Sequence, residues 1–158
     1  MLKKLKPYII SVVIALAVGG LSAVVTSDSM DVYSKINQPA LSPPSILFPI
    51  VWTILFTLMG ISAALIYSFR DRKRTDVTRA LTVYGVNLAV NFLWSIFFFN
   101  MQAYLFSFIW LLLLLAVIAV MIVLFKKVSP LAAYLQIPYL LWVTFAGYLN
   151  LSIYLLNR

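Results

Sequence analysis

The sequence predicts an all-α integral membrane protein, folded as a single bundle of five transmembrane helices over residues 1–158. Of its residues, 64% are hydrophobic and 10% are charged, whereas soluble domains are about half apolar and about a quarter charged. Five apolar stretches are long enough to cross a bilayer, which takes about 20 residues in a helix. The acidic residues all lie between these stretches: Asp28, Asp31, Asp71 and Asp76.

The expected spans cover residues 8–26, 46–69, 80–99, 103–125 and 130–156. With five spans, the amino end, the second loop and the fourth loop share one side, and they hold ten of the twelve Lys and Arg residues. The positive-inside rule then predicts a cytoplasmic amino terminus and an outer carboxyl terminus in the cell membrane. Membrane orientation also accounts for the net charge of +8, so no nucleic-acid partner is expected.

The first span has an alternative interpretation as a cleaved signal peptide. Lys3–Lys6 gives a basic start, and residues 20–23 (Gly-Leu-Ser-Ala) resemble a small-residue cleavage site. However, the apolar run Tyr8–Val25 is longer than a typical signal-peptide core, and cleavage would leave four spans. We therefore expect a retained first helix.

Small residues recur along three spans at a spacing that lets helix backbones approach closely. These small residues could allow close packing of helices within one bundle, or they could form the interface of a homodimer. The spacing alone does not distinguish these alternatives. The residues are Ser11, Ala15, Gly19 and Ala23 in the first span, Gly60 and Ala64 in the second, and Gly85 and Ala89 in the third.

The first loop, residues 27–45, is the one long connection, and it is expected to act as a lid. It contains Pro39, Pro43 and Pro44, which fix the backbone and restrict the residues before them. Long ordered loops often cover sites. A plain tether is the alternative, but it would need neither this length nor this stiffness.

Composition excludes several chemistries. The chain has no Cys and no His, so it lacks thiolate nucleophiles, disulfides, the commonest metal ligands and the usual axial ligand of haem iron. We expect no metal site and no obligatory cofactor. No carboxylate lies inside a span, although proton-coupled transport normally needs one. Any internal chemistry must rest on aromatic, amide and hydroxyl groups.

The third span carries a polar face, because Tyr84, Asn87, Asn91 and Trp94 recur at helical spacing. Asparagine within a span must find partners inside the protein, since lipid offers none. Hydrogen bonding between helices and a ligand-facing stripe are both compatible with this pattern, and they are not exclusive.

The second and fifth spans carry aromatic faces. In the fifth, Pro138 interrupts the helix and frees a carbonyl near Tyr134, and Trp142 is expected near mid-membrane, on the order of 18 Å into the span. Tyr139, Trp142, Ala146 and Asn150 share one face, as do Pro49, Trp52, Phe56 and Gly60 in the second span. We expect these faces to enclose an uncharged cavity beneath the lid that suits a large, planar, apolar molecule. The candidate ligand-binding residues are Tyr33, Pro43, Leu47, Trp52, Phe56, Asn87, Asn91, Trp94, Trp142, Ala146 and Leu149.

Several of these segments together resemble the translocator protein family, also called tryptophan-rich sensory protein or peripheral-type benzodiazepine receptor, in its bacterial type. The resemblance covers about residues 33–151, with its motifs in order. They are residues 38–44 with Phe48-Pro49-Ile50-Val51-Trp52, Asn91-Phe92-Leu93-Trp94 with Phe97–Phe99, and residues 128–133 with Pro138–Trp142 and Leu149-Asn150.

The resemblance implies a five-helix membrane receptor that binds porphyrins, notably protoporphyrin IX, and isoquinoline carboxamide or benzodiazepine ligands, often as a homodimer. It also implies light-dependent oxidative breakdown of the porphyrin, with porphyrin as ligand or substrate and Trp52 and Trp142 as candidate photo-redox residues. The carboxyl-terminal sterol motif fits poorly, because Leu151 stands where the family's tyrosine is expected, so sterol binding is not favoured. Trp110 stands where animal relatives carry an acid, so any role of that acid is absent.

Three functions follow from this sequence. A tetrapyrrole-binding membrane protein is the leading hypothesis, since a chain without His or Cys suits a metal-free porphyrin. A passive transporter of porphyrins or other hydrophobic compounds is the alternative from another class. A sensor or scaffold whose partner binds the basic second loop is the third, although that loop also simply sets topology.

Overall fold

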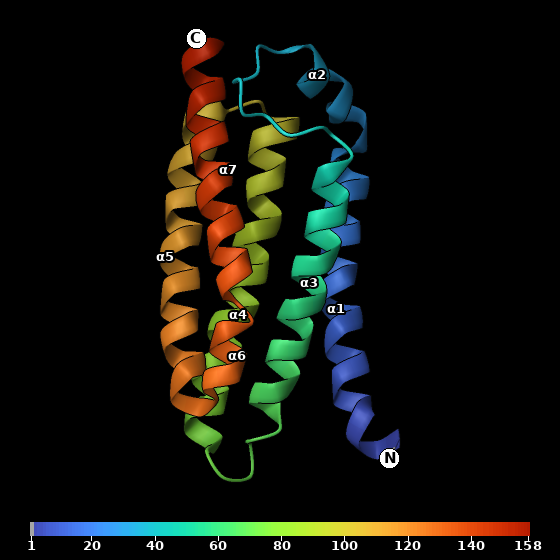
Figure 1. Ribbon diagram of the computed structural model, residues 1–158, viewed down its shortest axis with the longest axis vertical. Coiled ribbons are helices and arrows are strands. Elements are labelled where there is room, and N and C mark those ends of the chain that lie inside the picture. Colours follow the sequence, from blue (N-terminus) through green and yellow to red (C-terminus); the bar gives the residue numbers. More distant parts are fainter. Residues whose placement is uncertain (1) are drawn as a thin grey trace.

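The computed structural model describes residues 2–158, with side chains from Leu5 onward, so the side chains of Lys3 and Lys4 lie outside the described part. It is a bundle of helices that stand side by side (Figure 1), and five helical segments are long and apolar enough to cross a membrane. This confirms the predicted count. The segments are α1 (Leu2–Thr26), α3 (Leu47–Tyr67), α4 (Arg74–Ser95), α5 (Tyr104–Val128) and the pair α6 (Pro130–Tyr134) and α7 (Ile137–Leu156).

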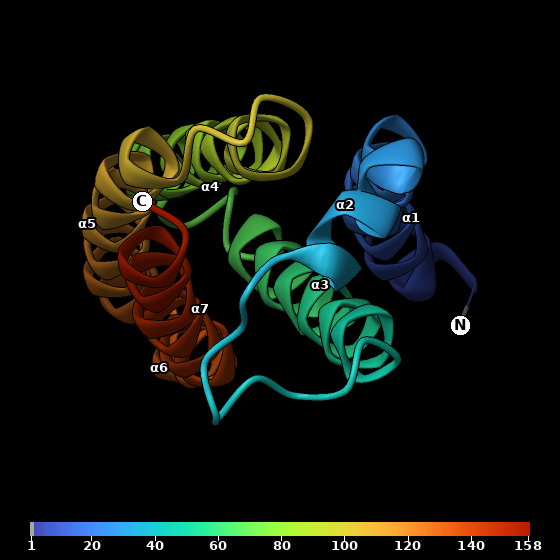
Figure 2. The same cartoon turned by 90° about the horizontal axis from the view of Figure 1, so that it is seen from above.

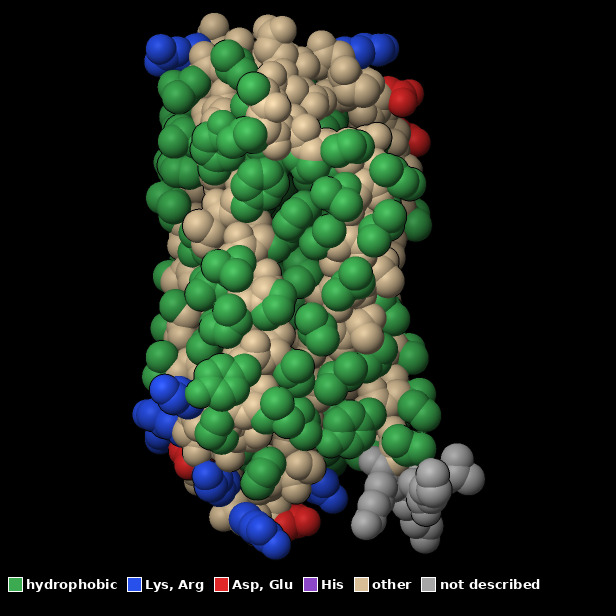
Figure 3. Space-filling view, viewed as in Figure 1, with side chains coloured by type: hydrophobic (Ala, Val, Ile, Leu, Met, Phe, Trp, Pro, Cys, Tyr) green, Lys and Arg blue, Asp and Glu red, His purple; other side chains and the backbone are tan. Residues whose placement is uncertain are grey.

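Charged side chains gather at the two ends of the bundle, and the belt between them is mainly hydrophobic (Figure 3). The start of α1, the α3–α4 turn and the α5–α6 junction form what we call the basic end. The opposite end, formed by the first loop and the end of α7, we call the lid end. All four Asp residues are exposed at these ends. The membrane orientation stays a prediction from charge.

The third span begins earlier than expected, at Arg74 rather than residue 80. The amide of Val77 donates to the Lys73 carbonyl (2.9 Å), and Asp76 in the first turn suits the positive helix amino end. The apolar run marks only the part of a helix that lies in hydrocarbon, whereas the helix itself continues into the polar region. The basic α3–α4 turn is correspondingly short.

The first loop is partly helical. A single turn of 3₁₀-helix, η1 (Ser27–Ser29), leads into α2 (Met30–Lys35), and the chain then crosses the lid end before entering α3 (Figure 2). This crossing segment is fastened to the end of α7. The Asn37 amide donates to Asn157 Oδ1 (3.0 Å), and Asn157 Nδ2 donates to the Asn37 carbonyl (2.9 Å).

Helices α1 and α3 approach closely where small residues meet. A Cβ built on Gly60 would lie 2.5 Å from the Val12 Cα, and one on Gly19 would lie 2.6 Å from the Phe56 ring. Ala15 is fully buried at the same contact. The small residues of α1 therefore allow close packing against α3 within the bundle. Gly85 faces open space, and a homodimer there stays a prediction.

The fifth span is interrupted, as predicted. The Ser129 hydroxyl accepts from the Ala132 amide (3.5 Å) and caps α6, while Pro138 lies in the first turn of α7. Proline therefore begins a helix here instead of kinking one. Between them Gln136 is fully buried, and neither of its side-chain amide atoms has a hydrogen-bond partner among the described residues.

We expect Gly60→Ala to destabilise the bundle by about 1–3 kcal/mol, because the added methyl would overlap the α1 backbone. The matched control is Gly85→Ala, whose methyl meets nothing within 4 Å and should leave stability unchanged or slightly higher. Thermal unfolding in detergent measures both. Equal midpoints for the two variants would contradict this account of the α1–α3 contact.

Candidate functional site

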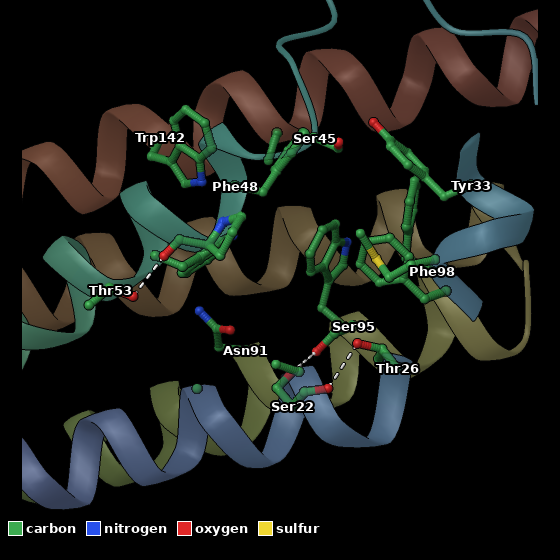
Figure 4. A pocket seen from close by; sticks show the side chains of 18 of the residues that line it. Ser22, Thr26, Tyr33, Ser45, Phe48, Thr53, Asn91, Ser95, Phe98 and Trp142 are labelled. Carbon is green, nitrogen blue, oxygen red and sulfur yellow. Dashed lines mark hydrogen bonds between the residues drawn. The ribbon is translucent and has the colours of Figure 1, made fainter. Parts of the chain in front are cut away.

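A cavity of about 590 Å³ lies in the lid half of the bundle, between α1, α3, α4 and α7 and beneath α2 (Figure 4). This volume falls within the range of small-molecule sites, about 300–1,000 Å³. Its walls are mainly aromatic and aliphatic, and no charged side chain lines it. Such a site suits a flat, largely apolar guest.

Three indole rings form part of the wall. Trp94 of α4 donates its N–H to Asn150, and the other two are Trp52 from α3 and Trp142 from α7. Trp52 lies against Phe56 (ring centroids 5.5 Å apart), and Trp142 meets Phe48 edge-on (5.9 Å). Figure 4 shows the Trp142 nitrogen pointing into the cavity. Neither the Trp52 nor the Trp142 N–H has a hydrogen-bond partner among the described side chains, so both donors are available to a ligand.

The floor of the cavity is a hydrogen-bonded triad between α4 and α7. Asn91 Nδ2 donates to the Tyr139 hydroxyl (2.7 Å), which donates to Asn87 Oδ1 (2.9 Å). Asn91 lines the cavity, whereas Asn87 is fully buried behind it. The polar face of the third span therefore joins helices at both positions and meets the cavity at one.

A second polar junction, centred on Asn150, holds the far wall. Its Oδ1 accepts from Trp94 Nε1 (3.2 Å) and from the Ser107 hydroxyl (3.2 Å). Its Nδ2 donates to the Tyr104 carbonyl (2.8 Å). One amide thus ties α7 to both α4 and α5, and it fixes the orientation of the Trp94 ring.

Aromatic rings also form the roof. Tyr33 of α2 is buried against Phe98 and Phe99, with ring centroids 6.0 and 5.7 Å apart. These phenylalanines lie on a π-helical turn, η2 (Ile96–Asn100), and Phe98 stacks on Trp94 (5.3 Å). Such turns occur often at functional sites, and this one places aromatic rings directly against Tyr33 of α2. The lid role of the first loop stays a prediction.

Eight of the eleven predicted ligand-binding residues line the cavity, namely Tyr33, Trp52, Phe56, Asn91, Trp94, Trp142, Ala146 and Leu149. The other three do not. Asn87 turns to Tyr139, Pro43 lies in the crossing segment of the first loop, and Leu47 is 37% exposed beside the inward Phe48. Whether any of these residues binds a ligand stays a prediction.

The first helix contributes a wall that the sequence prediction missed. Gly19, Ser22, Ala23 and Thr26 all line the cavity, and the Ser22 and Ser95 hydroxyls are hydrogen-bonded across α1 and α4. The small-residue spacing of the first span was the available signal. It was interpreted only as a packing surface, although one such surface can also leave space for a ligand.

The cavity offers few groups for chemistry. Among the described residues, no three His, Cys, Asp or Glu side chains come together in a group that could hold a metal ion. The lining provides indole N–H donors, the amides of Asn91 and Asn150, and hydroxyls, so it can bind and orient a guest. Proton abstraction by a carboxylate or an imidazole has no group to perform it here.

We expect Asn150→Leu to destabilise the protein by about 1–3 kcal/mol, because the Trp94 indole N–H would lose its acceptor and the Tyr104 carbonyl would lose one of its two side-chain donors. Trp94 should also become more mobile, so its fluorescence anisotropy should fall in a variant that keeps only this tryptophan. Thermal unfolding and anisotropy test the two effects. Unchanged values in both would show that Asn150 does not hold this wall.

Comparison with known proteins identifies the family of this chain. The profile of the TspO/MBR family matches residues 11–156. The chain is 38% identical over 125 residues to the tryptophan-rich protein TspO of Chlorobaculum tepidum, covering 79% of this chain and 78% of that protein. It is 34% identical over 149 residues to the TspO protein of Archaeoglobus fulgidus (93% and 94%) and 31% identical over 118 residues to the translocator protein of Ovis aries (75% and 70%). The chain therefore belongs to the TspO/MBR family of integral membrane proteins.

Proposed function

We propose that this protein is a membrane receptor for tetrapyrroles, protoporphyrin IX in particular, and that isoquinoline carboxamide and benzodiazepine ligands occupy the same cavity. The observation that carries the proposal is the uncharged cavity of about 590 Å³ with two indole N–H groups free. Family membership supports it, because the resemblance to this family in the sequence implies porphyrin binding.

The lining favours a porphyrin without a bound metal. A porphyrin ring is flat and apolar, so aromatic walls such as Phe56 and Trp142 give it van der Waals contact on its faces and edges. Without His or Cys the chain has no strong axial ligand for a central iron. The indole N–H groups would donate to carbonyl or carboxylate oxygens on the guest.

We further propose that light-dependent oxidation of the porphyrin takes place in this cavity. An excited porphyrin can transfer energy to dissolved oxygen, or it can take an electron from a nearby indole and pass that electron to oxygen, which becomes superoxide; in either case the activated oxygen then adds to the ring. Trp52 and Trp142 are positioned to exchange an electron with the excited ring, because both indoles line the space that it would occupy. They would then act as redox partners and not as acids or bases.

The shape of the cavity favours binding over passive transport. Its lining ends at the level of Asn91, and below this level the Asn87–Tyr139 hydrogen bond and the tight α1–α3 contact close the bundle. In the basic turn Lys73 Nζ already donates to the Lys127 carbonyl (2.8 Å), so the scaffold alternative would rest on the exposed Arg72 and Arg74. For a homodimer, the exposed Gly85 and Ala89 of α4 offer a close-packing face.

Replacement of both indoles tests the photo-redox role. We expect Trp52→Phe/Trp142→Phe to retain porphyrin binding within about tenfold, because phenyl rings keep the apolar walls. The light-dependent loss of porphyrin absorbance should fall to the rate of free porphyrin in the same detergent. Trp110→Phe is the matched control, since this indole donates to the Val90 carbonyl (2.8 Å) outside the cavity. Degradation at the original rate in the double variant would refute the role and leave binding intact.

Release of the lid tests its part in ligand retention. Asn157→Ala removes both hydrogen bonds that fasten the crossing segment to α7, so we expect faster porphyrin dissociation, by about fivefold to tenfold. Stopped-flow quenching of tryptophan fluorescence measures this rate, with the neighbouring Arg158→Ala as control. An unchanged rate would show that ligand leaves by a path the lid does not cover.

A further inference from the structure

A second hollow, of about 430 Å³, lies toward the basic end between α1, α3 and α4. It shares no lining residue with the cavity beneath the lid, and the proposed function makes no use of it. We call it the basic groove. Its mouth is formed by charged side chains and its inner part by apolar ones.

Two cations lie at the mouth, Lys6 of α1 and Arg70 of the α3–α4 turn, and both are exposed. The Arg70 guanidinium lies over the Tyr67 ring (4.4 Å from its centroid), and its Nε is 3.8 Å from an Asp71 oxygen. That carboxylate is 83% exposed, so water screens the pair strongly. Among the described side chains Lys6 has no carboxylate within salt-bridge distance. The mouth therefore carries positive charge that an anion could balance.

Deeper in the groove the wall becomes apolar. Ile10 and Ile14 of α1 lie one turn apart along it, and each is about half exposed. On α3 the wall is formed by Ala63 and Ala64, small side chains that leave room beside them. An apolar strip that begins directly at a cationic mouth matches an amphiphile, in which an anionic head group is followed by an apolar chain.

The innermost wall includes one polar group without a partner. Tyr84 lines the groove and is 8% exposed, and its hydroxyl has no hydrogen-bond partner among the described residues. It lies ten residues into α4, about 15 Å along the helix from Arg74, and helical side chains lean back toward the amino end of their helix. A buried O–H donor at this depth favours an uncharged acceptor such as an ester carbonyl.

We propose that the basic groove binds one anionic phospholipid of the leaflet that meets the basic end. Its phosphate lies between Lys6 and Arg70, one acyl chain follows Ile10 and Ile14, and an ester carbonyl accepts a hydrogen bond from Tyr84. Basic pockets between transmembrane helices bind anionic head groups in this manner. A free phosphate would leave the apolar wall uncovered, and a zwitterionic lipid would leave the positive mouth only partly balanced.

The test uses the full chain in detergent and counts bound lipid by native mass spectrometry, with phosphatidylglycerol as the anionic probe and phosphatidylcholine of the same acyl chains as the neutral one. We expect phosphatidylglycerol to be retained selectively. Lys6→Gln/Arg70→Gln should weaken its binding about 25-fold, since each cation near the surface contributes about a factor of five. Lys126→Gln/Lys127→Gln is the matched control, because it removes the same charge from the same end outside the groove.

Three outcomes would overturn the proposal. Equal binding of the two lipids would mean that the groove selects only for apolar chains. An equal loss in the control pair would show attraction to the whole basic end, with no defined site. Full competition by glycerol phosphate at the same concentration would show that a head group alone suffices.

A second variant tests whether the Tyr84 hydroxyl meets the ester carbonyl of the bound lipid. Tyr84→Phe should weaken binding of diester phosphatidylglycerol by about fivefold and leave binding of the ether-linked analogue unchanged, because an ether lacks the carbonyl acceptor. This conservative change removes only a hydroxyl that has no partner within the described structure, so the fold should persist. An equal effect on both lipids would remove Tyr84 from the site.

Discussion

The Asn91–Tyr139–Asn87 triad is the interaction on which the rest of the molecule depends. In hydrocarbon a polar side chain must find its partner within the protein, and here three such groups find one another across α4 and α7. The triad joins two helices that are distant in sequence. It also sets the depth at which the bundle closes, because the cavity begins immediately above it.

A cavity of this size is normally costly, since it forfeits packing between its walls. In this protein the polar junctions compensate by fixing the walls independently of one another. Asn150 holds Trp94 and ties α7 to α5, while the Gly60 contact holds α1 against α3. The helices therefore keep their positions without side chains filling the space between them. The bundle can therefore be stable and still contain a ligand site, because hydrogen bonds and close helix contacts hold the helices where no side chains fill the space.

Much of the fold could be predicted from the sequence because hydrocarbon imposes simple rules. Apolar length gave five helices, and the exclusion of carboxylates from lipid placed all four Asp residues at the ends. Helical spacing correctly predicted that Trp52 and Phe56 of α3, and Trp142 and Ala146 of α7, lie on helix faces that line the cavity. Spacing does not say which neighbour a face meets, so Asn87 was expected in the cavity although it bonds to Tyr139. The wall formed by α1 was missed for the same reason.

The break between α6 and α7 divides the fifth span into two rigid rods with different attachments. The short rod is tied to α3, because the Ser62 hydroxyl donates to the Ala132 carbonyl (2.7 Å), whereas the long rod carries Trp142 and Ala146. At the joint, the Gln136 backbone amide donates to the Ala133 carbonyl and the Leu140 amide donates to the Gln136 carbonyl (both 3.1 Å), while the Gln136 side chain has no hydrogen-bond partner among the described residues. The long rod is anchored separately, through Tyr139 to α4 and through Asn150 to α4 and α5. The cavity wall that carries Trp142 is therefore fixed independently of the α3 contact.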